Sequence, residues 1–176
     1  SIGTIEGLGA VAGLTERNFY GTGRSVKALL NTTDDRKQFT LETTDRLFYE
    51  NDVDVTYRAS YKQEDFSVAS SYKLDSFLTG VGFAYKINPD LRHSIDLDYQ
   101  LKDYIITDSS TVSTAIENSS GESASFILKN NLYYSTLNSL MLPKNGQYIN
   151  YTNFIESPTS STNGLIKNIV TFKNFK

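Results

Sequence analysis

The stretch RHSIDLDYQLKDYI, Arg92–Ile105, alternates apolar and polar residues over its whole length and predicts one long β-strand. Its apolar residues at every second position are Ile95, Leu97, Tyr99 and Leu101. Soluble strands usually have about five or six residues, and this one is about twice as long. The fold class of the whole chain must therefore accommodate a long strand with one apolar face.

A tight hairpin is predicted directly before this strand. Val81–Ile87 alternates in the same way, and the intervening Asn88-Pro89-Asp90 consists of residues that favour turns. Val53–Lys62 has a third alternating pattern. The three stretches predict one apolar face that carries Val81, Phe83, Tyr85, Ile95, Leu97 and Tyr99, and an opposite polar face that carries Asp54, Arg58, Asp96 and Asp98.

Similar alternation recurs along the chain, which has almost no helical period. Further strands are predicted at about Leu8–Glu16, Arg24–Thr33, Lys37–Asp45, Glu122–Thr136, Gln147–Glu156 and Gly164–Phe175. Most of these roughly nine strands span about 9 to 14 residues, and a tilted membrane strand needs about 9 to 11. The strand lengths therefore favour a membrane barrel over a soluble sheet.

The predicted connections differ in length. Short turns are expected at Gly21–Gly23, Asn88–Asp90 and Pro143–Gly146, and longer polar loops at Gln63–Lys73 and Thr107–Gly121. Outer-membrane barrels alternate short periplasmic turns with longer extracellular loops in this way. We therefore expect an all-β fold, an antiparallel transmembrane β-barrel with up-and-down topology, whose apolar face contacts lipid and whose polar face lines the lumen. A soluble antiparallel sheet alternates similarly and stays the alternative.

Composition excludes several classes of function. The 176 residues include no cysteine, so neither a disulfide framework nor a thiolate site can form. His93 is the single histidine, which excludes a multi-histidine metal site. With 17 Lys and Arg against 20 Asp and Glu, the chain lacks the basic balance of a nucleic-acid-binding protein. We expect no nucleic-acid partner.

Aromatic residues occur at or near predicted strand ends, where a membrane barrel has its interfacial girdles. They are Phe19, Tyr20, Phe48, Tyr49, Tyr72, Tyr104, Tyr133, Tyr134 and Tyr148. Packing between the strands of ordinary hairpins is the alternative explanation for the same positions.

No pattern for catalysis or cofactor binding stands out. Asp96 and Asp98 could form a carboxylate pair, although a polar row balanced by Lys102 is the more common arrangement. Asp34-Asp35 and Asp108 do not match a calcium loop, since calcium needs about six to eight oxygen ligands. We expect no catalytic residue, no cofactor and no metal, and hence a protein that is not an enzyme.

Two motifs carry a family resemblance. GLTERNFYGTGRSV, Gly13–Val26, contains Glu16, Asn18, Phe19, Gly21 and Gly23. NLYYSTLNSLMLPKNGQY, Asn131–Tyr148, contains Tyr134, Thr136, Asn138, Pro143, Gly146 and Tyr148. Both segments resemble parts of the barrel domain of the BamA-type outer-membrane protein assembly factors. The second departs from that pattern at Ser135, Leu137 and Ser139, where the family usually has Asp, Arg and Asp or Asn.

The resemblance implies a barrel of about sixteen strands, of which this chain supplies roughly nine to ten. Residues 1–176 would be one partial barrel domain, with Ser1–Glu6 as the remnant of the first strand and Gly164–Lys176 as about the tenth. The periplasmic POTRA modules and the carboxyl-terminal strands would be absent. Because the chain starts with Ser1 and stops on a strand-like pattern, we interpret it as a fragment.

The implied function is that of an insertase, an integral protein that folds and inserts β-barrel proteins into the bacterial outer membrane. Its implied partners are outer-membrane lipid, unfolded β-barrel substrate proteins and accessory assembly lipoproteins, the last through the periplasmic modules. A two-partner secretion transporter and a passive porin are the alternatives, and a soluble β-sandwich binding module is a third.

Overall fold

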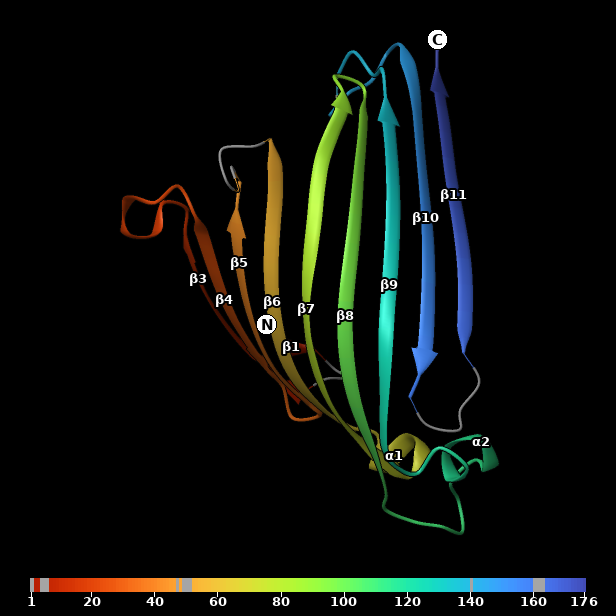
Figure 1. Ribbon diagram of the computed structural model, residues 1–176. Helices are drawn as coiled ribbons and strands as arrows, with labels where there is room; N and C mark the ends of the chain where they lie inside the picture. The colour runs from red at the N-terminus through yellow and green to blue at the C-terminus, as the bar shows by residue number, and fades with distance from the viewer. Residues whose placement is uncertain (1, 4–6, 47, 49–51, 140, 160–163) are drawn as a thin grey trace.

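One antiparallel β-sheet dominates the molecule. A computed structural model describes residues 2–3, 7–46, 48, 52–139, 141–159 and 164–176. Nine strands pair only with their neighbours in the sequence, in the spatial order β11-β10-β9-β8-β7-β6-β5-β4-β3 (Figure 1). Their bounds are β3 (Ala10–Glu16), β4 (Ser25–Thr32), β5 (Arg36–Asp45), β6 (Val53–Asp65), β7 (Tyr72–Asn88), β8 (Leu91–Ile106), β9 (Gly121–Ser135), β10 (Gly146–Pro158) and β11 (Leu165–Phe175). The expected all-β, up-and-down topology is confirmed, and the sheet is open.

The described residues outside this sheet form short elements. A two-stranded sheet pairs β1 (Ile2–Gly3) with β2 (Gly7–Leu8), and the helices are η1 (Phe19–Gly21), α1 (Ser67–Ser70) and α2 (Thr114–Glu117). No helix in the described ranges is long and apolar enough to cross a bilayer. The remnant strand expected at Ser1–Glu6 falls partly on residues 1 and 4–6, which lie outside the described residues. Its described part pairs with β2 and not with β3.

The connections alternate between the two ends of the sheet. The expected turns at Gly21–Gly23, Asn88–Asp90 and Pro143–Gly146 lie at one end, and the Thr107–Gly121 loop lies at the other (Figure 1). The loop expected over Gln63–Lys73 is shorter than predicted, because β6 continues to Asp65 and β7 begins at Tyr72. Polar residues at these strand ends keep the ladder pairing, since backbone pairing does not require apolar side chains.

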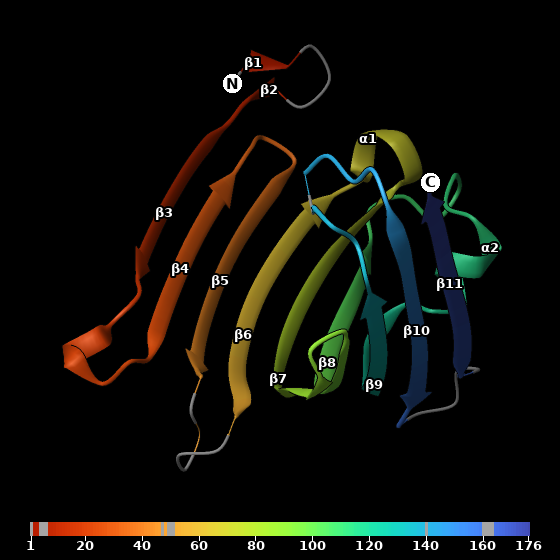
Figure 2. The ribbon, with the colours of Figure 1, turned by 90° about the horizontal axis from the view of Figure 1, so that it is seen from above.

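The sheet curves, and its two faces differ in exposure. Viewed along the strands, β3 to β11 follow an arc (Figure 2). Large apolar side chains on the convex face are exposed, among them Leu97 at 50% and Phe126 at 57%. Of the apolar residues that the structure describes, Val55 and Ile127 are the ones that are buried. The described part is thus a single layer, without the second sheet that a soluble β-sandwich packs against the first.

Candidate functional site

The register of β7 and β8 places the six apolar residues predicted to share a face on the convex face. Val81 pairs with Leu97 and Phe83 with Ile95, while Tyr85 and Tyr99 follow two residues further along the same strands. Paired residues of neighbouring strands lie on the same side of a sheet. The convex face therefore presents a continuous apolar surface over β7 and β8.

This surface is a band with a defined end. On β6 it extends from Val53 to Tyr61, and the next residue on the convex face is Gln63. Gln63, Asp75, Asp103 and Glu122 form one paired row across four strands, which ends the band. Eight steps of about 3.3 Å, tilted by about 40°, rise about 20 Å, near the ~25 Å height of the apolar belt of membrane barrels.

An ion pair lies beyond that polar row. Asp65 Oδ2 at the end of β6 is 2.8 Å from Lys73 Nζ on β7. Hydrogen bonds from Lys73 and then from Ser67 lower the pKa of Asp65 to about 2, and the bond to Asp65 raises the pKa of Lys73. The pair joins the ends of two strands outside the apolar band.

The four charged residues predicted to share the other face lie on the concave face. Arg58 of β6 extends across β7 and reaches two carboxylates of β8. Its Nη2 contacts Asp96 Oδ1, and its Nε lies 3.0 Å from Asp98 Oδ1 in an ion pair that lacks hydrogen-bond geometry. Asp54 pairs separately with Arg92, at 3.0 Å. Asp98 is the most enclosed of these side chains, with 11% exposure.

Two glycines of β7 make the crossing of Arg58 possible. Gly80 and Gly82 lie between β6 and β8 and leave the concave side of β7 bare. A Cβ atom at Gly80 would collide with Asp98 Oδ1, and one at Gly82 with Asp96 Oδ1. The alternating pattern did not reveal this role. A Gly-x-Gly inside a strand was the available signal, because glycine in a strand interior often marks close approach by another group.

Further ion pairs line the concave face. Glu64 is 9% exposed and binds two cations, Arg36 Nη2 at 3.0 Å and Lys62 Nζ at 2.7 Å. Glu156 of β10 lies 3.3 Å from Lys102 Nζ of β8. Buried charges are stable when they are paired, so this face is suited to a polar, water-filled interior.

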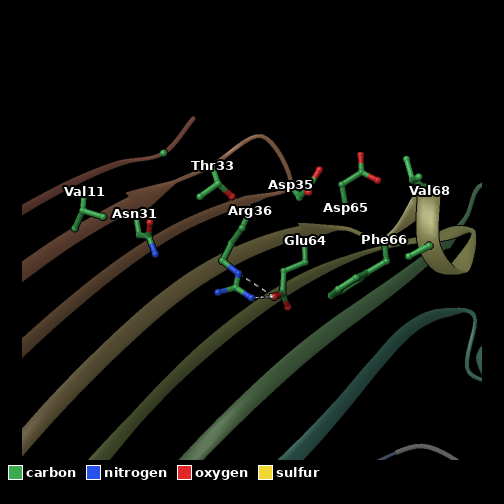
Figure 3. Close-up of a pocket in the computed structure, with 11 residues that line it drawn as sticks. Val11, Asn31, Thr33, Asp35, Arg36, Glu64, Asp65, Phe66 and Val68 are labelled. Carbon is green, nitrogen blue, oxygen red and sulfur yellow. Dashed lines mark hydrogen bonds and ion pairs between the residues drawn. The ribbon is translucent and has the colours of Figure 1, made fainter. Parts of the chain in front are cut away.

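A hollow of about 580 Å³ lies at the end of the concave face near α1. Val11, Phe66 and Val68 are among its lining residues, and Figure 3 shows the Arg36–Glu64 ion pair in the same hollow. Because Glu64 is already bound by two cations, its carboxylate is not left free for a ligand.

The first motif forms the turn between β3 and β4. Glu16 Oε1 accepts a hydrogen bond from the Asn18 backbone N–H at 3.0 Å, and Asn18 Oδ1 accepts one from the Gly23 N–H at 2.7 Å. Gly21 and Gly23 have φ values of 72° and 74°, which glycine adopts without steric cost. The spacing of Glu16, Asn18, Gly21 and Gly23 is thus explained by the turn. Phe19 and Tyr20 stack edge to face, with ring centroids 4.5 Å apart.

The second motif forms a longer connection than the short turn predicted at Pro143–Gly146. β9 ends at Ser135, one residue after Tyr134, and β10 begins at Gly146. Asn138 Oδ1 closes the connection by accepting hydrogen bonds from the backbone N–H groups of Lys144 and Asn145, at 3.0 and 3.1 Å. Pro143 lies inside this connection. An asparagine side chain, which readily substitutes for backbone acceptors in turns, extends the turn beyond the predicted residues.

Of the two explanations given for the aromatic residues at strand ends, the interfacial girdle is wrong for four residues. The register places four tyrosines on the concave face, whereas Leu97 and its neighbours lie on the convex face. These tyrosines are Tyr72, Tyr104, Tyr133 and Tyr148. Tyr72 packs on Tyr104 with ring centroids 5.9 Å apart, and Tyr133 on Tyr148 at 5.4 Å. Hairpin packing, the alternative explanation, accounts for these pairs. Tyr134 does lie on the convex face, and Tyr49 lies outside the described residues.

Groups that could carry chemistry are scarce in the part of the chain that the structure describes. No set of three or more His, Asp or Glu residues there is arranged to hold a metal ion. Asp108 accepts hydrogen bonds from Ser110 at the start of a loop, as a turn-forming residue does. His93 Nδ1 lies 2.8 Å from Tyr85 Oη. The candidate site that the described residues form consists of two surfaces, the apolar band and the ion-paired concave face.

Comparison with known proteins identifies the family. A family model described as the Omp85 superfamily domain matches residues 18–168. The chain belongs to the Omp85 superfamily. Among solved structures, the crystal structure of BamA from Haemophilus ducreyi lacking POTRA domains 1–3 matches with a TM-score of 0.68 and 20% sequence identity. The match covers 90% of this chain and 33% of that chain. No curated protein matches the chain.

Membership of the superfamily and the fold shared with that structure confirm the BamA-like barrel fold expected from the two motifs. The chain is part of an integral outer-membrane β-barrel protein of a Gram-negative bacterium. It spans about a third of the BamA structure that it matches.

Proposed function

We propose that the chain is part of the barrel wall of an insertase that folds and inserts β-barrel proteins into the bacterial outer membrane. The observation that carries the proposal is the match of its nine-stranded sheet to a BamA barrel over 90% of its residues. The superfamily also includes transporters, so the task of the whole protein needs a direct test.

The two faces have different roles in this proposal. The convex face contacts lipid through Val81, Phe83, Tyr85, Ile95, Leu97 and Tyr99. The concave face lines the lumen through Asp54, Arg58, Asp96 and Asp98. Support comes from the exposure of Leu97 and Phe83, at 50% and 38%, beside ion-paired carboxylates on the opposite face. Exposed apolar side chains are stable in hydrocarbon, whereas paired charges suit a watery interior.

Residues 1–176 are proposed to be one partial barrel domain, with POTRA modules and carboxyl-terminal strands outside them. A β-chain cannot enter hydrocarbon with unpaired backbone groups, because each costs several kcal/mol. An insertase therefore provides a seam where incoming strands pair before they meet lipid. In this proposal the segment forms the part of the barrel wall that positions the seam. Strand pairing at a seam requires no catalytic residue or cofactor, so the proposal includes none.

The proposed partners follow from that mechanism. They are outer-membrane lipid on the convex face, unfolded β-barrel substrates at the seam, and accessory lipoproteins bound through the periplasmic modules. The motif turn at Asn18–Gly23 supports the assignment, because its hydrogen bonds depend on the residues that carry the family resemblance.

The test is reconstitution of the full-length protein in lipid vesicles with an unfolded outer-membrane barrel as substrate. Protease protection of the folded substrate should rise with the protein present. Vesicles with a porin at the same density provide the control. Transport of a secreted partner without substrate folding would support the transporter, and passive conductance alone would support the porin. Either outcome would overturn the insertase proposal.

A further inference from the structure

Three asparagine side chains form a row across the convex face of β9, β10 and β11. The register pairs Asn130 with Asn153 and Asn153 with Asn168, and we call these three residues the amide ladder. The paired rows on both sides of it contain apolar residues, Leu132, Tyr151 and Val170 on one side and Leu128, Ile155 and Ile166 on the other. The ladder therefore interrupts an otherwise apolar surface.

The ladder lies inside the band and not at its rim. Asn153 comes seven residues after Gly146, where β10 begins, and five before Pro158, where it ends. On β8 the same row continues with Ile95, so the amides are confined to the three carboxyl-terminal strands, which lie side by side (Figure 1). Thr79 is also polar and lies in the band on β7, but its hydroxyl is satisfied because it donates a hydrogen bond to the Arg58 carbonyl oxygen at 3.3 Å.

The amides satisfy one another only in part. Asn168 Oδ1 accepts hydrogen bonds from Asn153 Nδ2 and from Tyr151 Oη, each at 2.9 Å. Within the described residues, the Asn130 amide, Asn153 Oδ1 and Asn168 Nδ2 have no side-chain hydrogen bond. Each asparagine side chain carries two donors and one acceptor oxygen, and lipid tails offer a partner for none of them.

We propose that the amide ladder is a contact between two copies of this barrel within the membrane. The proposal rests on the proposed lipid-facing role of the convex face. Each amide has both a donor and an acceptor, so the row is complementary to itself. A two-fold axis along the membrane normal brings the same row of each copy together in an isologous interface, the commonest arrangement of homo-oligomers. The unsatisfied amide groups then bond across the axis, and the flanking apolar rows pack around them.

The natural absence of cysteine in the chain allows a direct test by cross-linking. Val170→Cys lies on the row beside the ladder and is 66% exposed, which leaves the three amides intact. Leu97→Cys is the control, on the convex face of β8 with 50% exposure. Each is introduced into the full-length protein, with any other cysteine replaced, and oxidised in native outer membranes.

Val170→Cys is expected to give a disulfide-linked dimer of the protein and Leu97→Cys none. Adding Asn153→Leu and Asn168→Leu to Val170→Cys should lower the dimer yield at least fivefold. No dimer, a dimer unaffected by the leucines, or an adduct with a different protein would each overturn the proposal.

A separate measurement distinguishes failure of the ladder from failure of the lipid-facing assignment. A fluorophore on Leu97→Cys in vesicles of brominated lipid should be quenched when the convex face contacts lipid. Quenching without a Val170→Cys dimer rejects the ladder contact alone. A Leu97→Cys label that stays unquenched rejects the lipid-facing role, and with it the basis of the ladder proposal.

Discussion

The two faces of β7 and β8 are built in opposite ways from the same strands. On the convex face, large side chains such as Phe83 and Leu97 cover the backbone and remain exposed. On the concave face, Gly80 and Gly82 remove side chains from β7, and Arg58 occupies the space to reach Asp96 and Asp98. One face therefore depends on the surrounding solvent for its stability, and the other depends on contacts within the chain. Substitutions one or a few residues apart, but on different faces, should therefore change the free energy of unfolding by very different amounts.

The largest effect is expected from Gly80→Val. The new side chain would collide with Asp98 and come within 2.5 Å of the Leu97 carbonyl oxygen, so the ion cluster must open. We expect the free energy of unfolding of the full-length protein in lipid vesicles to fall by about 4 kcal/mol. Thr79→Val, one residue away on the convex face, should change it by less than about 0.5 kcal/mol. Equal effects at both positions would refute the difference between the faces.

Leu97→Arg tests the convex face. A charge in the lipid-facing band of a barrel costs about 3 kcal/mol near the middle of the bilayer. Gln100→Arg on the same strand faces the concave side and should stay within about 0.5 kcal/mol of the unsubstituted protein. Urea unfolding in vesicles measures both. A larger loss for Gln100→Arg than for Leu97→Arg would reverse the proposed assignment of lipid and lumen.

Arg58→Met should remove the cation that contacts both Asp96 and Asp98. The loss is expected to be about 2 kcal/mol, less than for a fully buried pair because Arg58 is 25% exposed. Arg92→Met is the matched control, since Arg92 pairs with Asp54 at 3.0 Å but is 48% exposed. Its loss should stay below about 1 kcal/mol. If the two variants lost equal stability, the crossing of Arg58 would have no special energetic role.

Asn18→Ala tests a turn where neither face is involved. It removes the acceptor for the Gly23 N–H and should lower the free energy of unfolding by about 1 kcal/mol. Arg17→Ala, beside it in the same turn, should have little effect. An unchanged stability of Asn18→Ala, measured by urea unfolding in vesicles, would show that the turn does not need the asparagine oxygen.

The smallest effect is expected from the protonation of Asp65, which lies outside the apolar band. Its pKa of about 2 lies below the ordinary value near 3.9, so the ion pair with Lys73 stabilises the folded state above about pH 4. That contribution is lost as the pH falls through about 2. In a carboxyl NMR titration, Lys73→Met should raise the pKa of Asp65, because it removes the largest cause of the shift. A midpoint near 4 in the unsubstituted protein would contradict the ion pair.

Alternation predicted the strands well because each strand has one apolar face. The nine strands, and the faces of Leu97 and Asp98, followed from side chains two residues apart. The turn at Asn18–Gly23 was found from its residues. Properties that depend on register across strands were missed, since no local pattern specifies which residue lies opposite another. The place of Gly80 under Arg58 and the row of Asn130, Asn153 and Asn168 are both of this kind.

Pairing of every strand with its sequence neighbour has a consequence for how such a sheet forms. Each new strand closes only the loop before it, so contacts are local and no distant segment must be found first. The longest of these connections between described strands joins β8 to β9 through residues 107–120. Doubling a loop adds only about 0.6 kcal/mol of closure entropy, so this step is little harder than the others. The chain can therefore add one hairpin after another at one edge of the sheet. The strands can then pair in the order in which they occur in the sequence.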